Sequence, residues 1–167
     1  RRHTRYGTVT GVQTCALPIF KPGDTSEVAA ILEIANDAQT AIVPQGGNTG
    51  FMGGATPDDS GNSILLSLRR MNKVREIDTQ NMSMTVEAGC ILQNLQAVAD
   101  ETGLYFPLNH AAKGSCTIGG NLGTNAGGLN VVRYGTTRAL TLGLEVVLMG
   151  DWVNIVFFEF KIVVILE

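Results

Sequence analysis

Apolar residues recur with the period of an α-helix in two parts of the chain. In residues 24–37 four of them fall on one helical face: Val28, Ile31, Leu32 and Ala35. Asp24 precedes this face and Glu27 follows three residues later, which is the pattern of a capping box. A second helical stripe lies in residues 91–102, and Gly103 is positioned to end that helix. We therefore expect two amphipathic helices.

Short apolar segments separate these helices and indicate β-strands. Strands are predicted at residues 41–43, 64–68, 84–87, 104–106 and 144–148. The alternation of strands and helices indicates an α/β or α+β architecture. A chain of 167 residues is long enough to bury the core of one such domain.

The two ends of the chain differ from this middle part. Residues 1–20 follow neither period, and we expect a non-native or disordered leader there, with the main domain at 21–151. A mitochondrial targeting peptide is an alternative for the leader, because its first residues are basic. Residues 152–167 form an apolar tail that is too short and too polar for a membrane helix. We expect a strand there, or a terminus that is not native.

Composition excludes several function classes. The net charge is −3 and no basic cluster occurs, which argues against a nucleic-acid partner. Three cysteines without a C-x-x-C motif and only two histidines argue against a disulfide framework and a metal site. A reducing compartment follows, so we expect a cytoplasmic protein, or a mitochondrial one in a eukaryote.

Glycine is concentrated in two clusters, and these carry the candidate chemistry. The first cluster follows the strand at 41–43 and consists of Gly46, Gly47, Asn48, Thr49, Gly50, Gly53 and Gly54. The second cluster spans residues 114–128, and its many small residues argue against a core helix. Glycine lets backbone N–H groups approach an anion closely, and consecutive N–H groups form an anion-binding concavity. A plain turn and a flexible linker are the alternative interpretations.

Neither cluster matches the two commonest nucleotide-binding motifs. No G-x-x-x-x-G-K-[ST] string occurs, and no G-x-G-x-x-G opens a helix after a strand. The residue pattern by itself therefore indicates an anion-binding or dinucleotide-binding domain.

Six strings in order resemble a known family. They lie at residues 44–50, 88–90, 106–108, 113–128, 133–135 and 142–148. Together they resemble the FAD-binding PCMH-type domain of the vanillyl-alcohol-oxidase flavoproteins, and most of all its D-2-hydroxyglutarate dehydrogenase and D-lactate dehydrogenase-like group. The resemblance implies an α+β fold of two α/β subdomains with FAD between them.

The resemblance also implies which residues bind FAD. The first cluster would surround the diphosphate. A second wall would consist of Pro107, Gly114, Ser115, Gly119, Gly120, Asn121, Thr124, Asn125, Gly127 and Gly128. Glu145 and Val146 would lie on the adenine side. Some members attach the flavin through a histidine in the first loop, where this chain has Asn48, so we expect non-covalent FAD.

The implied activity is the FAD-linked oxidation of a small D-2-hydroxy acid, by hydride transfer to flavin. No catalytic residue is assigned, because the family carries its catalytic groups downstream of the FAD-binding domain. Two alternatives remain, namely another FAD-linked oxidase or reductase and a non-redox phosphate-binding module. A fragment too incomplete to fold is a third possibility.

Overall fold

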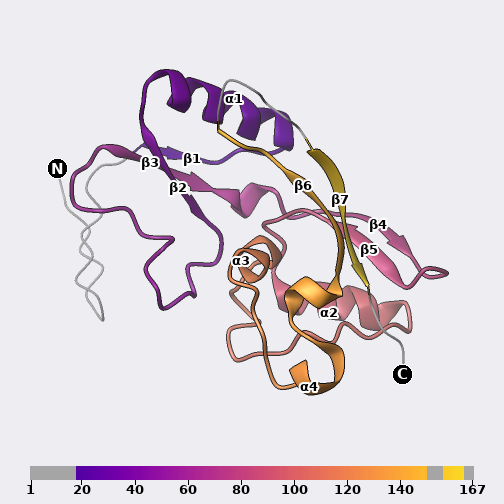
Figure 1. Ribbon diagram of the computed structural model, residues 1–167. Coiled ribbons are helices and arrows are strands. Elements are labelled where there is room, and N and C mark those ends of the chain that lie inside the picture. The colour runs from indigo at the N-terminus through magenta and orange to yellow at the C-terminus, as the bar shows by residue number, and fades with distance from the viewer. Residues whose placement is uncertain (1–17, 150–155, 164–167) are drawn as a thin grey trace.

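The first of two lobes is built on a parallel sheet. The computed structural model describes residues 18–149 and the backbone of residues 156–163. Strands β1 (Ile19–Phe20), β3 (Ser63–Ser67) and β2 (Ala41–Gln45) pair in the order β1-β3-β2, all parallel. Helix α1 (Thr25–Asp37) joins β1 to β2 and lies along this sheet (Figure 1). We call this unit the first lobe.

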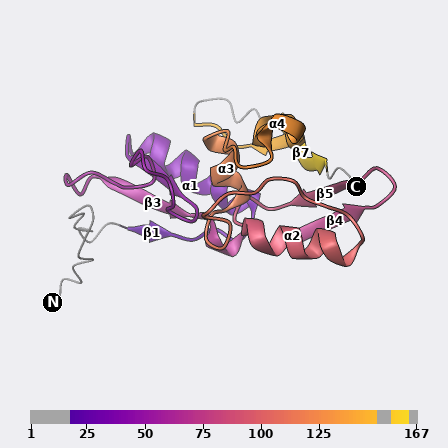
Figure 2. The ribbon, with the colours of Figure 1, turned by 90° about the horizontal axis from the view of Figure 1, so that it is seen from below.

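The second lobe is built on an antiparallel sheet. Its strands are β4 (Val74–Asp78), β5 (Ser83–Val86), β7 (Val156–Val163) and β6 (Thr141–Val146), in that spatial order. Helices α2 (Leu92–Glu101), α3 (Ile118–Gly123) and α4 (Val131–Tyr134) belong to the same lobe. The two lobes lie side by side (Figure 2), joined by the 3₁₀ turn η1 (Leu68–Arg70). A second 3₁₀ turn, η2 (Thr137–Leu140), precedes β6. The expected α+β class is confirmed.

Helix α1 begins where its sequence pattern predicts. Asp24 adopts the extended N-cap conformation, and its Oδ1 accepts a hydrogen bond from Glu27 N at 2.9 Å. The Glu27 carboxylate reaches back one residue further than a capping box requires and accepts from Gly23 N at 2.7 Å. At this end of α1 the Asp24 side chain therefore satisfies one of the N–H groups that a helix start leaves free.

The two lobes have cores of unequal size. The larger core belongs to the second lobe and includes Met84, Leu92, Leu95, Phe106 and Ile118, each at most 1% exposed. In the first lobe the buried cluster consists of Val28, Leu66 and Met71. Apolar burial drives folding in proportion to area, so the second lobe contributes more of the stability.

One predicted strand is absent. Gly103 ends α2 in the left-handed conformation with φ +75°, as expected. Residues 104–106, however, form no strand. The N–H of Leu104 instead bonds back to Ala99 O at 3.0 Å, and Phe106 is buried at 1% exposure. The prediction of a strand was wrong because an apolar segment can be buried by packing without pairing to a neighbour.

Residues near both ends of the chain pair with the two sheets. Ile19 and Phe20, which sequence analysis placed in the leader, pair with Leu65 and Leu66 of β3. Residues 1–17 lie outside the described residues, so the rest of the expected leader cannot be compared. The tail contains strand β7, which pairs with β5 and β6. Residues 150–155 and 164–167 also lie outside the described part.

Candidate functional site

The first glycine cluster is an open loop at the carboxyl end of β2. No hydrogen bond from the backbone N–H groups of residues 47–50 occurs within the described part of the chain. A Cβ added at Gly50 or Gly54 would have no atom within 4 Å, and Asn48 has a left-handed φ of +53°. Gln45 Nε2 donates to Ala55 O at 2.8 Å and ties the two sides of the loop together. The loop therefore has open space at Gly50 and Gly54, beside N–H groups that make no hydrogen bond within the described part of the chain.

The two glycine clusters meet at the junction of the lobes. A Cβ on Gly46 would overlap Thr117 Oγ1, and one on Gly47 would overlap the carbonyl group of Ser115. At Gly47 the two backbones approach each other so closely that only glycine fits, whereas at Gly46 the contact is with the Thr117 side chain. A cleft of about 490 Å³ at this junction is lined from both sides, by Gly47, Gly89, Gly114, Ser115 and Thr117 among others.

The second cluster includes a helix, which sequence analysis had argued against. Residues Ile118–Gly123 form α3, and Ile118 is fully buried. Glycine lowers helix propensity, but at one of the three glycines of α3 tertiary packing requires it. Gly119 lies against Ala88, where a Cβ would come within 2.8 Å of the alanine side chain. The prediction was wrong because propensity is a weak guide where a helix must approach another backbone closely.

Several residues predicted to bind the cofactor make hydrogen bonds within the second lobe. Asn121 is 4% exposed, and its amide nitrogen donates to Cys116 Sγ at 3.5 Å. Asn125 Oδ1 accepts from Arg138 N at 3.0 Å, while Pro107 O accepts from the Asn130 side chain at 3.0 Å.

Other members of the second wall are held in the same way. Thr124 Oγ1 donates to Gly120 O at 3.0 Å, Gly128 packs on the Asn109 carbonyl, and Gly127 lies near Val131. These contacts hold the second cluster in shape.

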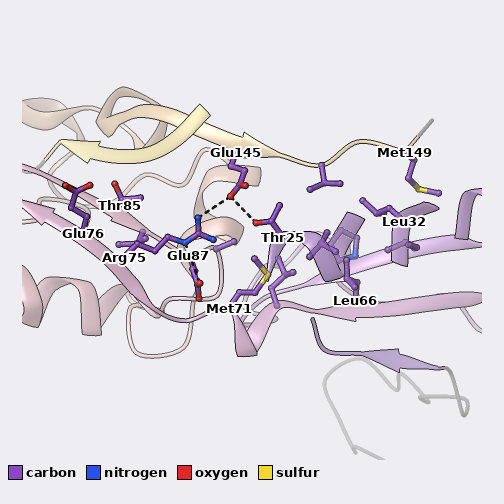
Figure 3. Close-up of a pocket in the computed structure, with 17 residues that line it drawn as sticks. Thr25, Leu32, Leu66, Met71, Arg75, Glu76, Thr85, Glu87, Glu145 and Met149 are labelled. Carbon is purple, nitrogen blue, oxygen red and sulfur yellow. Dashed lines mark hydrogen bonds and ion pairs between the residues drawn. The ribbon is translucent and has the colours of Figure 1, made fainter. Parts of the chain in front are cut away.

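Glu145 lies elsewhere, in a larger cavity between the lobes (Figure 3). The cavity measures about 860 Å³, and its walls are mainly apolar, with Val28, Leu32, Ile42 and Leu66 from the first lobe. Glu145 is the only predicted site residue that lines this cavity, and Val146 does not line it. The two glycine clusters therefore lie together in the structure, but Glu145 and Val146 do not line the cleft between them.

A polar network at one end of this cavity ties the lobes together. Thr25 of α1 donates to Glu145 Oε2 at 3.0 Å, and Arg75 of β4 contacts the same oxygen at 3.4 Å (Figure 3). Arg75 also lies 3.5 Å from Glu87, which is buried and accepts from Lys73 N at 2.9 Å. One guanidinium thus contacts two carboxylates and offsets part of their combined charge. Arg75 was not among the predicted site residues, because the apolar pattern did not predict β4.

The two described cysteines are buried thiols. Cys90 and Cys116 are 3% and 2% exposed. Burial raises the pKa of Cys90 to about 11 and also raises the pKa of Cys116. His110 Nε2 lies 3.7 Å from Cys116 Sγ. Because a nucleophilic cysteine needs a lowered pKa, these environments are those of small apolar core residues.

Residues 18–149 and 156–163 contain neither a cluster of metal-ligating side chains nor a membrane-spanning helix. In that part of the chain no three His, Cys, Asp or Glu side chains are grouped as metal ligands. Nor does it contain a helix of the length and apolar character needed to cross a membrane.

The fold and the site define a class: a two-lobed α+β domain whose two glycine clusters meet at the junction of the lobes. A family model described as "FAD binding domain" matches residues 16–152. The chain therefore belongs to the FAD binding domain family, and FAD is the cofactor of that family.

Curated relatives share close to half of the aligned residues. The chain is 46% identical over 126 residues to "D-2-hydroxyglutarate dehydrogenase, mitochondrial" of Arabidopsis thaliana, covering 75% of this chain and 22% of the relative. It is 43% identical over 129 residues to a mitochondrial Schizosaccharomyces pombe protein that is provisionally named a D-lactate dehydrogenase, covering 77% and 24%. The chain thus spans about a quarter of the length of these relatives.

A solved structure shows the same fold. The chain superposes on an alkyldihydroxyacetonephosphate synthase with a TM-score of 0.74 and 21% sequence identity. The match covers 87% of this chain and 30% of the solved chain. The likeness extends to the fold and confirms the expected PCMH-type architecture.

Proposed function

We propose that this chain is the FAD-binding part of an oxidoreductase that oxidises a D-2-hydroxy acid of the 2-hydroxyglutarate or lactate class. The observation that carries the proposal is the open first cluster, where the N–H groups of residues 47–50 are free. Membership of the FAD binding domain family and the names of the relatives support the cofactor and the substrate class.

The residues present fit a bound FAD. The open space at Gly50 and Gly54 leaves room for a ligand next to free donors. Such donors neutralise a diphosphate without a lysine. We assign the diphosphate to Gly46, Gly47, Asn48, Thr49 and Gly50, with Gly53 and Gly54 beside them. The second cluster forms the opposite wall, because Ser115 and Thr117 touch the first loop.

We propose that FAD is held without a covalent bond. Asn48, the residue at the point where some family members carry a histidine, offers no nucleophilic nitrogen. The raised pKa values of Cys90 and Cys116 keep both thiols protonated near neutral pH.

Bound FAD supplies the two-electron acceptor for the proposed reaction. The hydrogen on Cα of the hydroxy acid leaves with the bonding electron pair, as a hydride. The hydroxyl proton passes to a base, so that a 2-oxo acid forms. The part of this chain is to bind and orient the cofactor. No residue of the chain is assigned as that base. Because both relatives named above are mitochondrial, we propose the mitochondrion for a eukaryotic protein and the cytoplasm otherwise.

Titration of the full 167-residue chain with FAD tests the proposal, with FMN as the matched control. FMN carries the same flavin and one phosphate but lacks the adenosine monophosphate portion of FAD. We expect saturable quenching of flavin fluorescence with FAD and much weaker binding of FMN. Equal binding of ADP and FAD would favour a non-redox phosphate-binding module. A folded chain that binds none of these ligands would refute the flavoprotein assignment.

A further inference from the structure

The cavity between the lobes is separate from the proposed FAD site. Its volume of about 860 Å³ lies within the range of pockets that hold small molecules. No glycine of either cluster lines it, and it shares no lining residue with the cleft of about 490 Å³ where the clusters meet. The proposed function therefore leaves this cavity without a role.

One side of the cavity is apolar. Leu32 of α1, Leu66 of β3 and Met149 line this side (Figure 3). Val147 lies on the same wall as Met149, and Met149 is 46% exposed. Covering such apolar surface in a concave site is favourable in proportion to its area. This side of the cavity therefore suits the hydrocarbon part of a ligand.

The other side of the cavity carries an excess of negative charge. Three carboxylates line it, those of Glu76, Glu87 and Glu145, together with the guanidinium of Arg75. Arg75 lies within 3.5 Å of both Glu87 and Glu145, so its single charge is already shared. The side chain of Glu145 is only 22% exposed. A ligand group on this side would therefore be favoured by a positive charge and disfavoured by a negative one.

Thr85 adds a hydroxyl group without a partner to the charged side. Thr85 is 7% exposed, and it lines the cavity near Glu76 (Figure 3). Its side chain makes no hydrogen bond within the described part of the chain. Buried polar groups are normally paired, so this exception needs an explanation. A ligand that donates hydrogen bonds in the cavity would supply the missing partner.

We propose that this cavity binds a small amphiphile that has an apolar chain and a single ammonium group. The chain lies against Leu32, Leu66 and Met149. The ammonium group lies on the charged side, where Glu145 and Thr85 offer acceptor oxygens. A hydroxy acid is an anion and is disfavoured there, so this ligand is distinct from the substrate of the proposed function. The inference goes beyond that function and does not depend on it.

The test is isothermal titration calorimetry of the full chain with three probes that share one chain length. Decylammonium carries the positive group, decanol is neutral, and decanoate is the matched control of opposite charge. Each probe is used below the concentration at which it forms micelles. Glu145→Gln removes the charge but keeps the shape and an acceptor for Thr25. Glu33→Gln is its control, because Glu33 is an exposed carboxylate of α1 that does not line the cavity.

We expect decylammonium to bind at one site, and about tenfold or more tightly than decanoate, because hydrogen bonds to charged groups are the stronger ones. E145Q should weaken decylammonium by about tenfold for the same reason and leave decanol unchanged. E33Q should change neither. Leu32→Phe narrows the apolar side and should weaken decylammonium and decanol by the same factor. An excess of FAD should leave the affinity for decylammonium unchanged.

Other outcomes overturn the inference. Equal affinity for decylammonium and decanoate would show that the cavity does not select for positive charge, and a folded chain that binds neither would show that it is not a site. Equal weakening by E145Q and E33Q would indicate attraction to the acidic chain as a whole. Displacement of decylammonium by FAD would assign the cavity to the cofactor. Should E145Q not fold, Glu76→Gln makes the same test, because Glu76 is exposed and lines the cavity.

Discussion

Replacing Gly47 with alanine tests directly whether the two glycine clusters pack against each other. The new Cβ would overlap the backbone carbonyl of Ser115, which cannot rotate away as a side chain could. Overpacking of this kind costs about 1–3 kcal/mol. A small protein loses roughly 1–3 kcal/mol of stability per molar urea. We therefore expect G47A to lower the midpoint of urea unfolding by about 1 M.

Gly50→Ala in the same loop is the matched control. Its Cβ would have no atom within 4 Å, and its backbone is not in the left-handed region. Alanine at a compatible glycine position stabilises a protein by about 0.4–1 kcal/mol, through the unfolded state. G50A should therefore fold at least as well as the unmodified chain. It should nevertheless bind FAD more weakly, because the methyl group fills space beside the free N–H donors.

The assay combines urea unfolding, followed by far-ultraviolet circular dichroism, with FAD titration of each folded variant. If the two clusters pack as described, G47A should lower the stability of the fold, whereas G50A should lower the affinity for FAD. A G47A chain that unfolds at the same urea concentration as the unmodified one would refute this packing. Unchanged FAD affinity in G50A would show that the open face of the loop is not part of the proposed FAD site.

Three further substitutions test the fold around the site. Phe106→Ala should cost about 3–5 kcal/mol in chemical unfolding, since Phe106 is 1% exposed in the larger core. Glu145→Ala should cost about 1 kcal/mol in a thermal melt, by removing the bonds from Thr25 and Arg75. Because the pKa of Cys90 rises from 9.0 to about 11 on folding, stability should fall as pH rises from 9 to 11, and Cys90→Ala should flatten that fall.

Elements with a strong local period were predictable from the sequence. The capping residue Asp24 and the apolar face of residues 28–35 locate α1, and the stripe before Gly103 locates α2. The strand predictions at 41–43, 64–68 and 84–87 agree with β2, β3 and β5 to within about two residues. The predicted strand at 144–148 overlaps β6, Thr141–Val146. Periodicity succeeds here because it depends on residues that are neighbours in the sequence.

Elements formed through distant contacts were not predictable in the same way. Strand β4 contains Arg75 and Glu76 within a short run, so its apolar signal is weak. Helix α3 exists although glycine disfavours helices, because Gly119 lets it approach Ala88. The segment at 104–106 has the apolar composition of a strand, yet its backbone bonds to the end of α2. In each case packing between distant segments overrode local preference.

The order of residues along the chain was enough to identify the family of this protein. Its two glycine clusters define which backbone donors are available, and their order matches one family of FAD-binding domains. The tertiary structure decided the geometry. It places Gly46 against Thr117 and Gly47 against Ser115. It also places Glu145 beside Arg75, away from the glycine clusters. The physical reason is that glycine acts through local backbone freedom, whereas contact between remote segments depends on how the two lobes pack.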